Sequence, residues 1–149
     1  HVNQHSSYQP DIVVWMQPNV PIRETSTIDA TINKLIETDA DSCITCYEVT
    51  QIPELMKTIN DKGILVSNFK NVRGIRRQEF SKRYLADGSV VAMKKRALTN
   101  NSGPREAHAF LGNKVAPLLQ SSRMYSLEID DYDDLALAEF YIQKTLYTG

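Results

Sequence analysis

Two groups of polar residues have the types and positions needed to hold an acidic ligand. Gln17 follows a short apolar run, residues 11–16, and two prolines directly after it end any strand. The end of a strand in an open α/β sheet is where ligands commonly bind, and the Gln17 amide offers both a donor and an acceptor. Arg76 and Arg77 are adjacent, and the planar guanidinium group matches a carboxylate or a phosphate.

Charges of opposite sign are separated along the chain. Residues 57–96 contain eleven Lys and Arg against three Asp and Glu, whereas residues 124–149 contain six Asp and Glu against one Lys. Such blocks suit a protein that holds an anion on one side and a cation on the other. The simpler alternative is two solvated faces. The acidic run by itself is also typical of a helix start capped by Asp130 or Asp131.

The two cysteines and three histidines do not predict a reactive centre. Cys43 and Cys46 have a spacing found in redox and zinc sites. Their surroundings predict a strand, however, and side chains three apart in a strand point to opposite faces. We therefore expect two small buried thiols. His1, His5 and His108 lie near no plausible nucleophile, so no Ser-His-Asp or Cys-His arrangement is predicted.

The apolar pattern predicts an α/β fold with a mainly parallel sheet flanked by helices. Strands are expected at residues 11–16, 42–50, 89–93, 115–119 and 124–129, and helices at about residues 26–36 and 131–147. The first strand, helix and second strand have the order of a right-handed βαβ unit. Residues 1–10 are expected to form a flexible arm. Because the first βα units of such a sheet are missing, the chain is expected to begin within a domain.

Three segments, in this order, resemble motifs of the acylneuraminate (CMP-sugar) cytidylyltransferase family. Residues 16–23 resemble Leu-Gln-Pro-Thr-Ser-Pro-Leu-Arg. Residues 76–91 are similar to Arg-Arg-Gln, a Tyr, and Asn-Gly-Ala before a strand that carries a Tyr, but Asp87 replaces the Asn and Val91 replaces the last Tyr. Residues 128–139 resemble Asp-Ile-Asp-Thr-x-x-Asp-x-x-x-Ala-Glu at matching spacing. The resemblance covers about residues 11–142.

The resemblance implies a nucleotide-diphospho-sugar transferase-like fold with a site for a 3-deoxy-sugar acid and Mg²⁺. The metal carboxylates of the family fall on Glu128 and Asp130, and residues two apart on a strand share a face. The residues implied on the sugar side are Gln17, Arg76, Arg77, Gln78, Tyr84, Asp87 and Gly88. An ionised Asp87 repels a carboxylate, so it bears on which sugar binds. Arg23 is expected to be a structural charge near the strand end.

The implied reaction is attack of the sugar's anomeric hydroxyl on the α-phosphorus of CTP, with release of pyrophosphate. The implied assembly is a homodimer formed through an excursion at about residues 70–85. The family's Arg-x-Gly-Ser loop, which holds the CTP phosphates, has no counterpart among the six scattered glycines, so this chain alone is expected to be inactive. The alternatives are a catalytically incomplete sugar-binding, metal-binding or dimer-forming module, and a longer working protein.

Composition excludes some other classes of protein. The chain has 149 residues, enough for one domain, and a net charge of −1, which does not suit a generally basic nucleic-acid binder. No stretch approaches the roughly 20 apolar residues of a membrane helix, and no signal peptide is recognised. The sequence therefore predicts a cytoplasmic protein that binds neither nucleic acid nor membranes.

Overall fold

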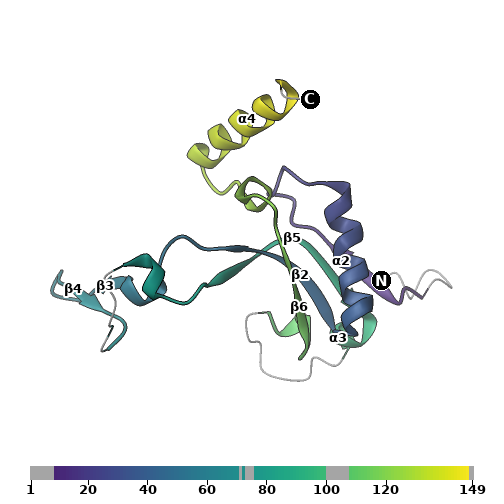
Figure 1. Cartoon of the computed structure of the whole chain (residues 1–149), viewed down its shortest axis with the longest axis horizontal. Coiled ribbons are helices and arrows are strands. Elements are labelled where there is room, and N and C mark those ends of the chain that lie inside the picture. Colours follow the sequence, from purple (N-terminus) through teal and green to yellow (C-terminus); the bar gives the residue numbers. More distant parts are fainter. Residues whose placement is uncertain (1–8, 71, 73–75, 100–107, 148–149) are drawn as a thin grey trace. The chain divides into compact units, whose positions relative to one another are not determined.

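The computed structural model describes residues 9–70, 72, 76–99 and 108–147, and the chain divides into two compact units (Figure 1). The first unit comprises His1–Tyr47 and Ala86–Gly149, and the second unit comprises Glu48–Leu85. Most of the arm predicted at residues 1–10 lies outside the described residues. Within the described part of the chain, no helix is long and apolar enough to cross a membrane.

A four-stranded sheet lies at the centre of the first unit. Its strands, in spatial order, are β1 (Ile12–Trp15), β5 (Tyr84–Lys94), β2 (Ser42–Glu48) and β6 (Val115–Leu119). β1 pairs antiparallel with β5, and β2 pairs parallel with β6. Between β5 and β2, the Lys94 N–H donates to the Asp41 carbonyl at 2.9 Å, and the Val90 N–H donates to Thr45 Oγ1 at 3.0 Å.

The predicted α/β class is confirmed, but the prediction of a mainly parallel sheet is wrong. The sheet is mixed, with one parallel pair and otherwise antiparallel neighbours, because β5 lies between β1 and β2 and runs against them. The apolar run at residues 89–93 predicted a strand, and Val90–Met93 are buried residues of β5. An apolar run indicates that a strand is buried, but it does not indicate whether the strand runs parallel or antiparallel to its neighbours. The sequence pattern therefore did not reveal that β5 is antiparallel.

Apolar clusters cover both faces of the sheet. Consecutive residues of a strand point to opposite faces, and in β5 Ala92 belongs to one cluster while Val91 and Met93 belong to the other. The first cluster contains Leu35 of helix α2, and the second contains Leu111. Each face of the sheet therefore carries an apolar cluster.

The two cysteines are buried free thiols, as the sequence predicted. Burial raises the pKa of Cys43 to about 11, and burial also raises the pKa of Cys46. A thiol with a raised pKa stays protonated and is a poor nucleophile and a poor metal ligand.

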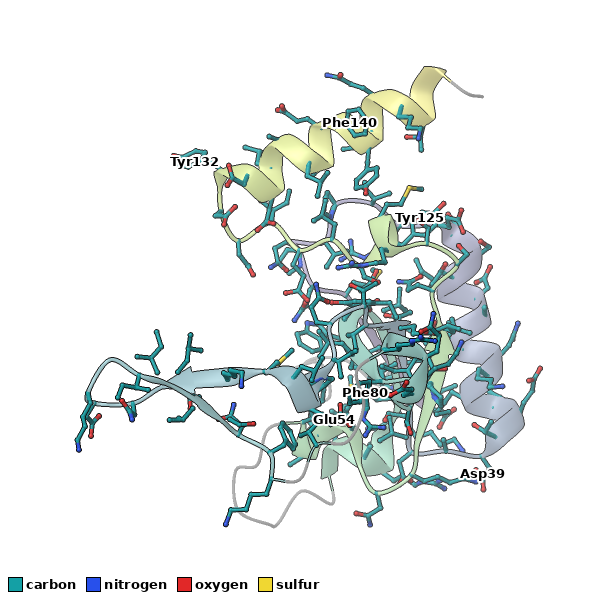
Figure 2. The ribbon with its side chains drawn as sticks, turned by 60° about the vertical axis from the view of Figure 1, so that its left-hand side comes forward. Asp39, Glu54, Phe80, Tyr125, Tyr132 and Phe140 are labelled. Carbon is teal, nitrogen blue, oxygen red and sulfur yellow. The ribbon has the colours of Figure 1, made fainter. Side chains whose placement is uncertain are left out.

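Helices and short 3-10 turns connect the strands of the first unit. They are α2 (Thr25–Thr38), α3 (Lys95–Thr99), η3 (Ala109–Leu111), η4 (Arg123–Ser126) and α4 (Tyr132–Tyr147). α2 buries Thr31 and Leu35, and it ends at Asp39, which has left-handed backbone angles and whose carboxylate accepts a hydrogen bond from Lys94 (Asp39 is labelled in Figure 2). α4 buries Ala138, whereas Tyr132 and Phe140 are exposed (Figure 2).

The second unit contains a small hairpin and short turns. Its hairpin pairs β3 (Lys57–Ile59) with β4 (Leu65–Ser67), and the 3-10 turns η1 (Pro53–Leu55) and η2 (Arg77–Glu79) lie on either side of it in sequence. Every residue of both hairpin strands is exposed. The second unit thus lacks a sheet face buried within itself.

Candidate functional site

A cavity of about 190 Å³ in the first unit brings together residues from all three motifs. It is lined by Trp15, Gln17, Ile44, Ala86, Asp87, Gly88, His108, Phe110 and Glu128. Four of these residues, Gln17, Asp87, Gly88 and Glu128, were predicted as site residues from the sequence. We call this space the first-unit cavity.

Gln17 is fixed between the end of β1 and the turn in β5. Its N–H donates to the Gly88 carbonyl at 3.4 Å. Gly88 has a φ of +60°, and a Cβ there would lie 2.9 Å from the Gln17 Cδ atom. Only glycine allows both this backbone angle and this close approach. Gln17 Oε1 is buried and has no hydrogen-bond partner among the described residues.

Arg23 has the structural role that the sequence predicted. Its Nε donates to the Ser89 carbonyl at 2.9 Å, and its Nη2 donates to the Gln17 carbonyl. Arg23 therefore ties the segment after β1 to β5, and its guanidinium is occupied by backbone carbonyls rather than directed at a ligand.

Asp87 is held by donors from within the protein. It is 2% exposed, and Thr45 Oγ1 and the Ser89 N–H donate to its Oδ1 while Ser126 Oγ donates to its Oδ2. These bonds satisfy most of the acceptor capacity of the carboxylate. Asp87 consequently joins β2, β5 and η4 at the wall of the cavity, and it adds a negative charge there.

The acidic segment before α4 does not form the predicted strand at residues 124–129. Residues 123–126 form η4 instead, and the Leu127 N–H turns back to the Met124 carbonyl. The segment is attached to the loop after β1, since the Ile129 N–H donates to the Asn19 carbonyl at 2.8 Å. Local turn hydrogen bonds replaced a strand ladder, so the assumption that Glu128 and Asp130 share a strand face was wrong.

Glu128 and Asp130 nevertheless influence each other. Burial raises the pKa of Glu128, and the negative charges of Asp130, Asp87 and Asp134 raise it further. Glu128 lines the first-unit cavity, whereas Asp130 lines a neighbouring hollow of about 250 Å³ with Asp131 and Tyr132. Asn19 Nδ2 donates to Asp130 Oδ1 at 3.1 Å and fixes that carboxylate.

Two other acidic residues are used to start α4. Asp131 Oδ1 accepts the N–H groups of Asp133 and Asp134, each at 2.9 Å. In return, Asp134 Oδ2 accepts the N–H groups of Asp130 and Asp131. This reciprocal arrangement is a capping box, which confirms Asp131 as the cap. It leaves Glu128 and Asp130 as the carboxylates available to a ligand.

These two carboxylates fit a hard cation whose shell is completed by other oxygens. Mg²⁺ keeps several waters and binds through one or two carboxylates plus substrate phosphates. Among the described residues, no group of three or more His, Cys, Asp and Glu side chains is placed to hold a metal. The donors present therefore match an open magnesium site and do not match a closed cage.

The other predicted sugar-side residues lie in the second unit. Gln78 lines a cavity of about 550 Å³ with Phe80, Lys82 and Arg83, which we call the second-unit cavity. Arg76 and Tyr84 are exposed, and Arg77 begins η2. None of these residues lines the first-unit cavity.

Ion pairs neutralise the cations at the second-unit cavity. Lys82 Nζ lies 2.8 Å from Glu48 Oε2, and Arg83 Nη2 lies 2.5 Å from Glu54 Oε1. An anionic ligand there must compete with these glutamates for Lys82 and Arg83.

Comparison with known proteins supports the resemblance. No protein-family profile matches the chain. Similar curated proteins include N-acylneuraminate cytidylyltransferases of Streptococcus agalactiae serotypes III, Ia and V. Each is 26% identical to this chain over 121 residues, which are 81% of this chain and 28% of the relative. These matches support a relationship to the N-acylneuraminate cytidylyltransferase family. The aligned part spans little more than a quarter of the length of these curated relatives.

Sequence reasoning missed five residues of the cavity, namely Trp15, Ile44, Ala86, His108 and Phe110. Trp15 precedes Gln17 by two positions, so the alternation of a strand gave a signal that both side chains lie on one side. His108 and Phe110 lie more than 90 residues after Trp15 in the sequence, and only the tertiary fold brings them to the same cavity. No sequence pattern identified them.

Proposed function

We propose that this chain holds the sugar acid and Mg²⁺ in a cytidylyltransferase-type nucleotidyl transfer that activates a 3-deoxy-sugar acid, sialic acid-like, to its CMP-sugar. The observation that carries this proposal is the first-unit cavity, where Gln17, Gly88 and Glu128 meet. The similar proteins are N-acylneuraminate cytidylyltransferases, so N-acylneuraminate is the first sugar acid to test.

Glu128 and Asp130 would hold the magnesium ion. When bound, Mg²⁺ supplies positive charge beside the phosphate oxygens on which negative charge develops during nucleotidyl transfer. The two carboxylates need no other role in the reaction. Burial is the main cause of the raised pKa of Glu128 and the charge of Asp130 adds to it; a bound cation would offset that repulsion.

Gln17 and the Asp87-Gly88 turn would orient the sugar. The Gln17 amide is fixed by Gly88 and Arg23, so a sugar hydroxyl meets a preorganised partner. Asp87 acts on the sugar through the shape and charge of the cavity, because its oxygens already accept three hydrogen bonds.

The second unit would supply cationic and polar partners for the sugar carboxylate. Arg76, Arg77, Gln78 and Tyr84 have this role by resemblance. Arg76 and Gln78 are exposed, so a ligand or another protein surface can reach them. We include in this proposal a homodimer formed through the second unit.

Metal binding tests the assignment of the carboxylates. In calorimetric titration with MgCl₂, we expect Glu128→Gln and Asp130→Asn each to weaken binding at least about tenfold. The matched control is Asp133→Asn, which removes the same charge from the same region, and whose carboxylate makes no hydrogen bond in the described structure. Equal affinities in all three variants would contradict the magnesium site.

Substrate binding and turnover test the activity. With CTP, Mg²⁺ and N-acetylneuraminate, we expect this chain to bind the sugar acid but to release no pyrophosphate, because its sequence contains no counterpart of the family's Arg-x-Gly-Ser loop. Sugar-dependent pyrophosphate release would show that other segments of the chain hold the phosphates. Absence of sugar binding under these conditions would contradict the proposal and favour a dimer-forming module.

A further inference from the structure

Three aromatic rings form one wall of the first-unit cavity. The Trp15 and Phe110 rings meet edge to face, with centroids 5.6 Å apart and an interplanar angle of 80°. The His108 and Phe110 rings are 6.2 Å apart at 75°. Phe110 packs against the apolar cluster below the sheet, so it is the anchor of this group. Trp15 and His108 remain partly exposed, and they present ring surface to the cavity.

The other side of the cavity is rich in hydrogen-bond acceptors. Gln17 Oε1 is buried without a partner among the described residues, and a buried acceptor is costly until a donor reaches it. Glu128 adds a carboxylate, and the Asp87 carboxylate lies just behind the wall. A ligand that fits this space offers an apolar ring face on one side and hydroxyl donors on the other.

His108 is held in place by its backbone. Its φ of 67° and ψ of 12° are left-handed, and its carbonyl accepts the Leu111 N–H at 2.9 Å to start η3. Histidine is one of the few residues that adopt this conformation with some frequency. The ring nitrogens have no hydrogen-bond partner in the described part of the chain, so one is free to donate to a ligand oxygen and the other to accept from a ligand hydroxyl.

We propose that Trp15 and His108 determine which ligand enters the first-unit cavity: an uncharged, hydroxyl-bearing ring lies against Trp15, and His108 hydrogen-bonds one of its hydroxyls. In the sugar acid of the proposed function, on which this inference rests, the hydroxyl-bearing part enters the cavity and the carboxylate stays outside it. A carboxylate placed inside would face Glu128 and Asp87, whose charges repel it.

Trp15 provides the measurement, because it is the single tryptophan of the chain. Its fluorescence is followed during titration with N-acetylneuraminate and, separately, with the uncharged methyl ester of that sugar. We expect both to change the emission of the wild-type chain, with the ester bound more weakly because it lacks the negative charge that Arg76 and Arg77 would hold. His108→Gly removes the ring and tolerates the left-handed backbone, and it is expected to weaken both ligands about tenfold. His108→Asn, which also tolerates that backbone, is expected to recover part of the loss.

Lys62→Ala is the control, since Lys62 is exposed in the second unit, and it is expected to leave both affinities unchanged. If both ligands bind and His108→Gly has no effect, the role of His108 is refuted while the proposed function stands. If the acid binds in calorimetric titration without changing the emission of Trp15, the placement of the sugar ring against Trp15 is refuted. If only the ester binds, the proposed function fails and the inference survives. If neither binds, both fail.

Discussion

The two units hold their polar residues in opposite ways. In the first unit, Asp87 and Gln17 are packed between strands, and each is fixed by bonds to segments distant in sequence. In the second unit, Lys82 and Arg83 are held by ion pairs with Glu48 and Glu54, and the hairpin strands have no covered face. Exposed ion pairs contribute little stability, typically less than about 1 kcal/mol.

This difference shows which of the two units holds its polar groups in a preorganised arrangement. The residues of the first-unit cavity are fixed by the packed strands of the core, so the cavity has its geometry before any ligand binds. The residues of the second unit depend on weak local contacts, and a partner surface or a ligand would have to complete their environment. The expected consequences can be measured unit by unit.

The largest difference is expected between matched truncations in the two units. Leu35 is fully buried, so Leu35→Ala leaves a cavity in the core and should lower the free energy of unfolding by about 2–5 kcal/mol. Ile59 in β3 is 72% exposed, so Ile59→Ala should change the free energy of unfolding by about 0.5 kcal/mol or less. Urea denaturation followed by circular dichroism measures both. A comparable loss from Ile59→Ala would mean that the second unit has a buried core.

Alanine substitutions at two glycines with similar backbone angles distinguish the cost of backbone strain from the cost of a steric clash. Gly63 has a φ of +73° and open space around it, so Gly63→Ala should lower the free energy of unfolding by about 1 kcal/mol through backbone strain alone. Gly88→Ala carries the same strain and forces the new Cβ against Gln17, which should add about 1–3 kcal/mol. Equal losses of unfolding free energy in the two variants would show that Gln17 moves aside freely.

Assembly tests whether another surface covers the second unit. Leu65 is 64% exposed, so Leu65→Asp should leave the monomer stable while disrupting a homodimer that buries this side chain. Light scattering should give about twice 16.9 kDa for the wild-type chain and a lower mass for the variant. Lys62→Asp is the control. A wild-type mass near 16.9 kDa that does not change on dilution would refute the dimer.

The smallest expected effect is a pH dependence in the first unit. The Lys114 backbone N–H and the Arg96 side chain hold the pKa of Asp41 below its ordinary value. A carboxylate whose folded pKa is lowered contributes stability above its unfolded pKa, and that contribution is lost as the pH falls through the folded pKa, between about pH 5 and pH 2. The melting temperature of Asp41→Asn should therefore fall less steeply on acidification than the melting temperature of the wild-type chain. Parallel curves would contradict this.

Much of the fold was predictable because burial leaves a pattern in the sequence. The strand at residues 115–119 and the helix near residues 131–147 were placed within a residue or two of β6 and α4. The sequence narrowed the cap of this helix to Asp130 or Asp131, and local hydrogen bonds show that it is Asp131. Local signals of this kind survive in the folded protein.

The features that were missed depend on contacts between distant segments. The direction of β5 is set by its neighbours, and a 3-10 turn stands at residues 123–126 where a strand was predicted. Part of the site followed from the motifs, since Gln17, Gly88 and Glu128 do meet. His108 was not predicted, because its place at the cavity depends on contacts between segments that are distant in sequence and not on a local periodic pattern.

The bonds made by Asp87 also decide when during folding a ligand site comes into existence. Thr45 lies 42 residues before Asp87, and Ser126 lies 39 residues after it, so both contacts close long loops. Contacts of long sequence separation are slow to form because the chain loses entropy before it gains their energy. The Ser89 amide proton, which Asp87 accepts, should therefore exchange with solvent only through global opening of the first unit. A partly folded chain can contain the helix α2 and the buried thiols and still have nothing with which to recognise its ligand.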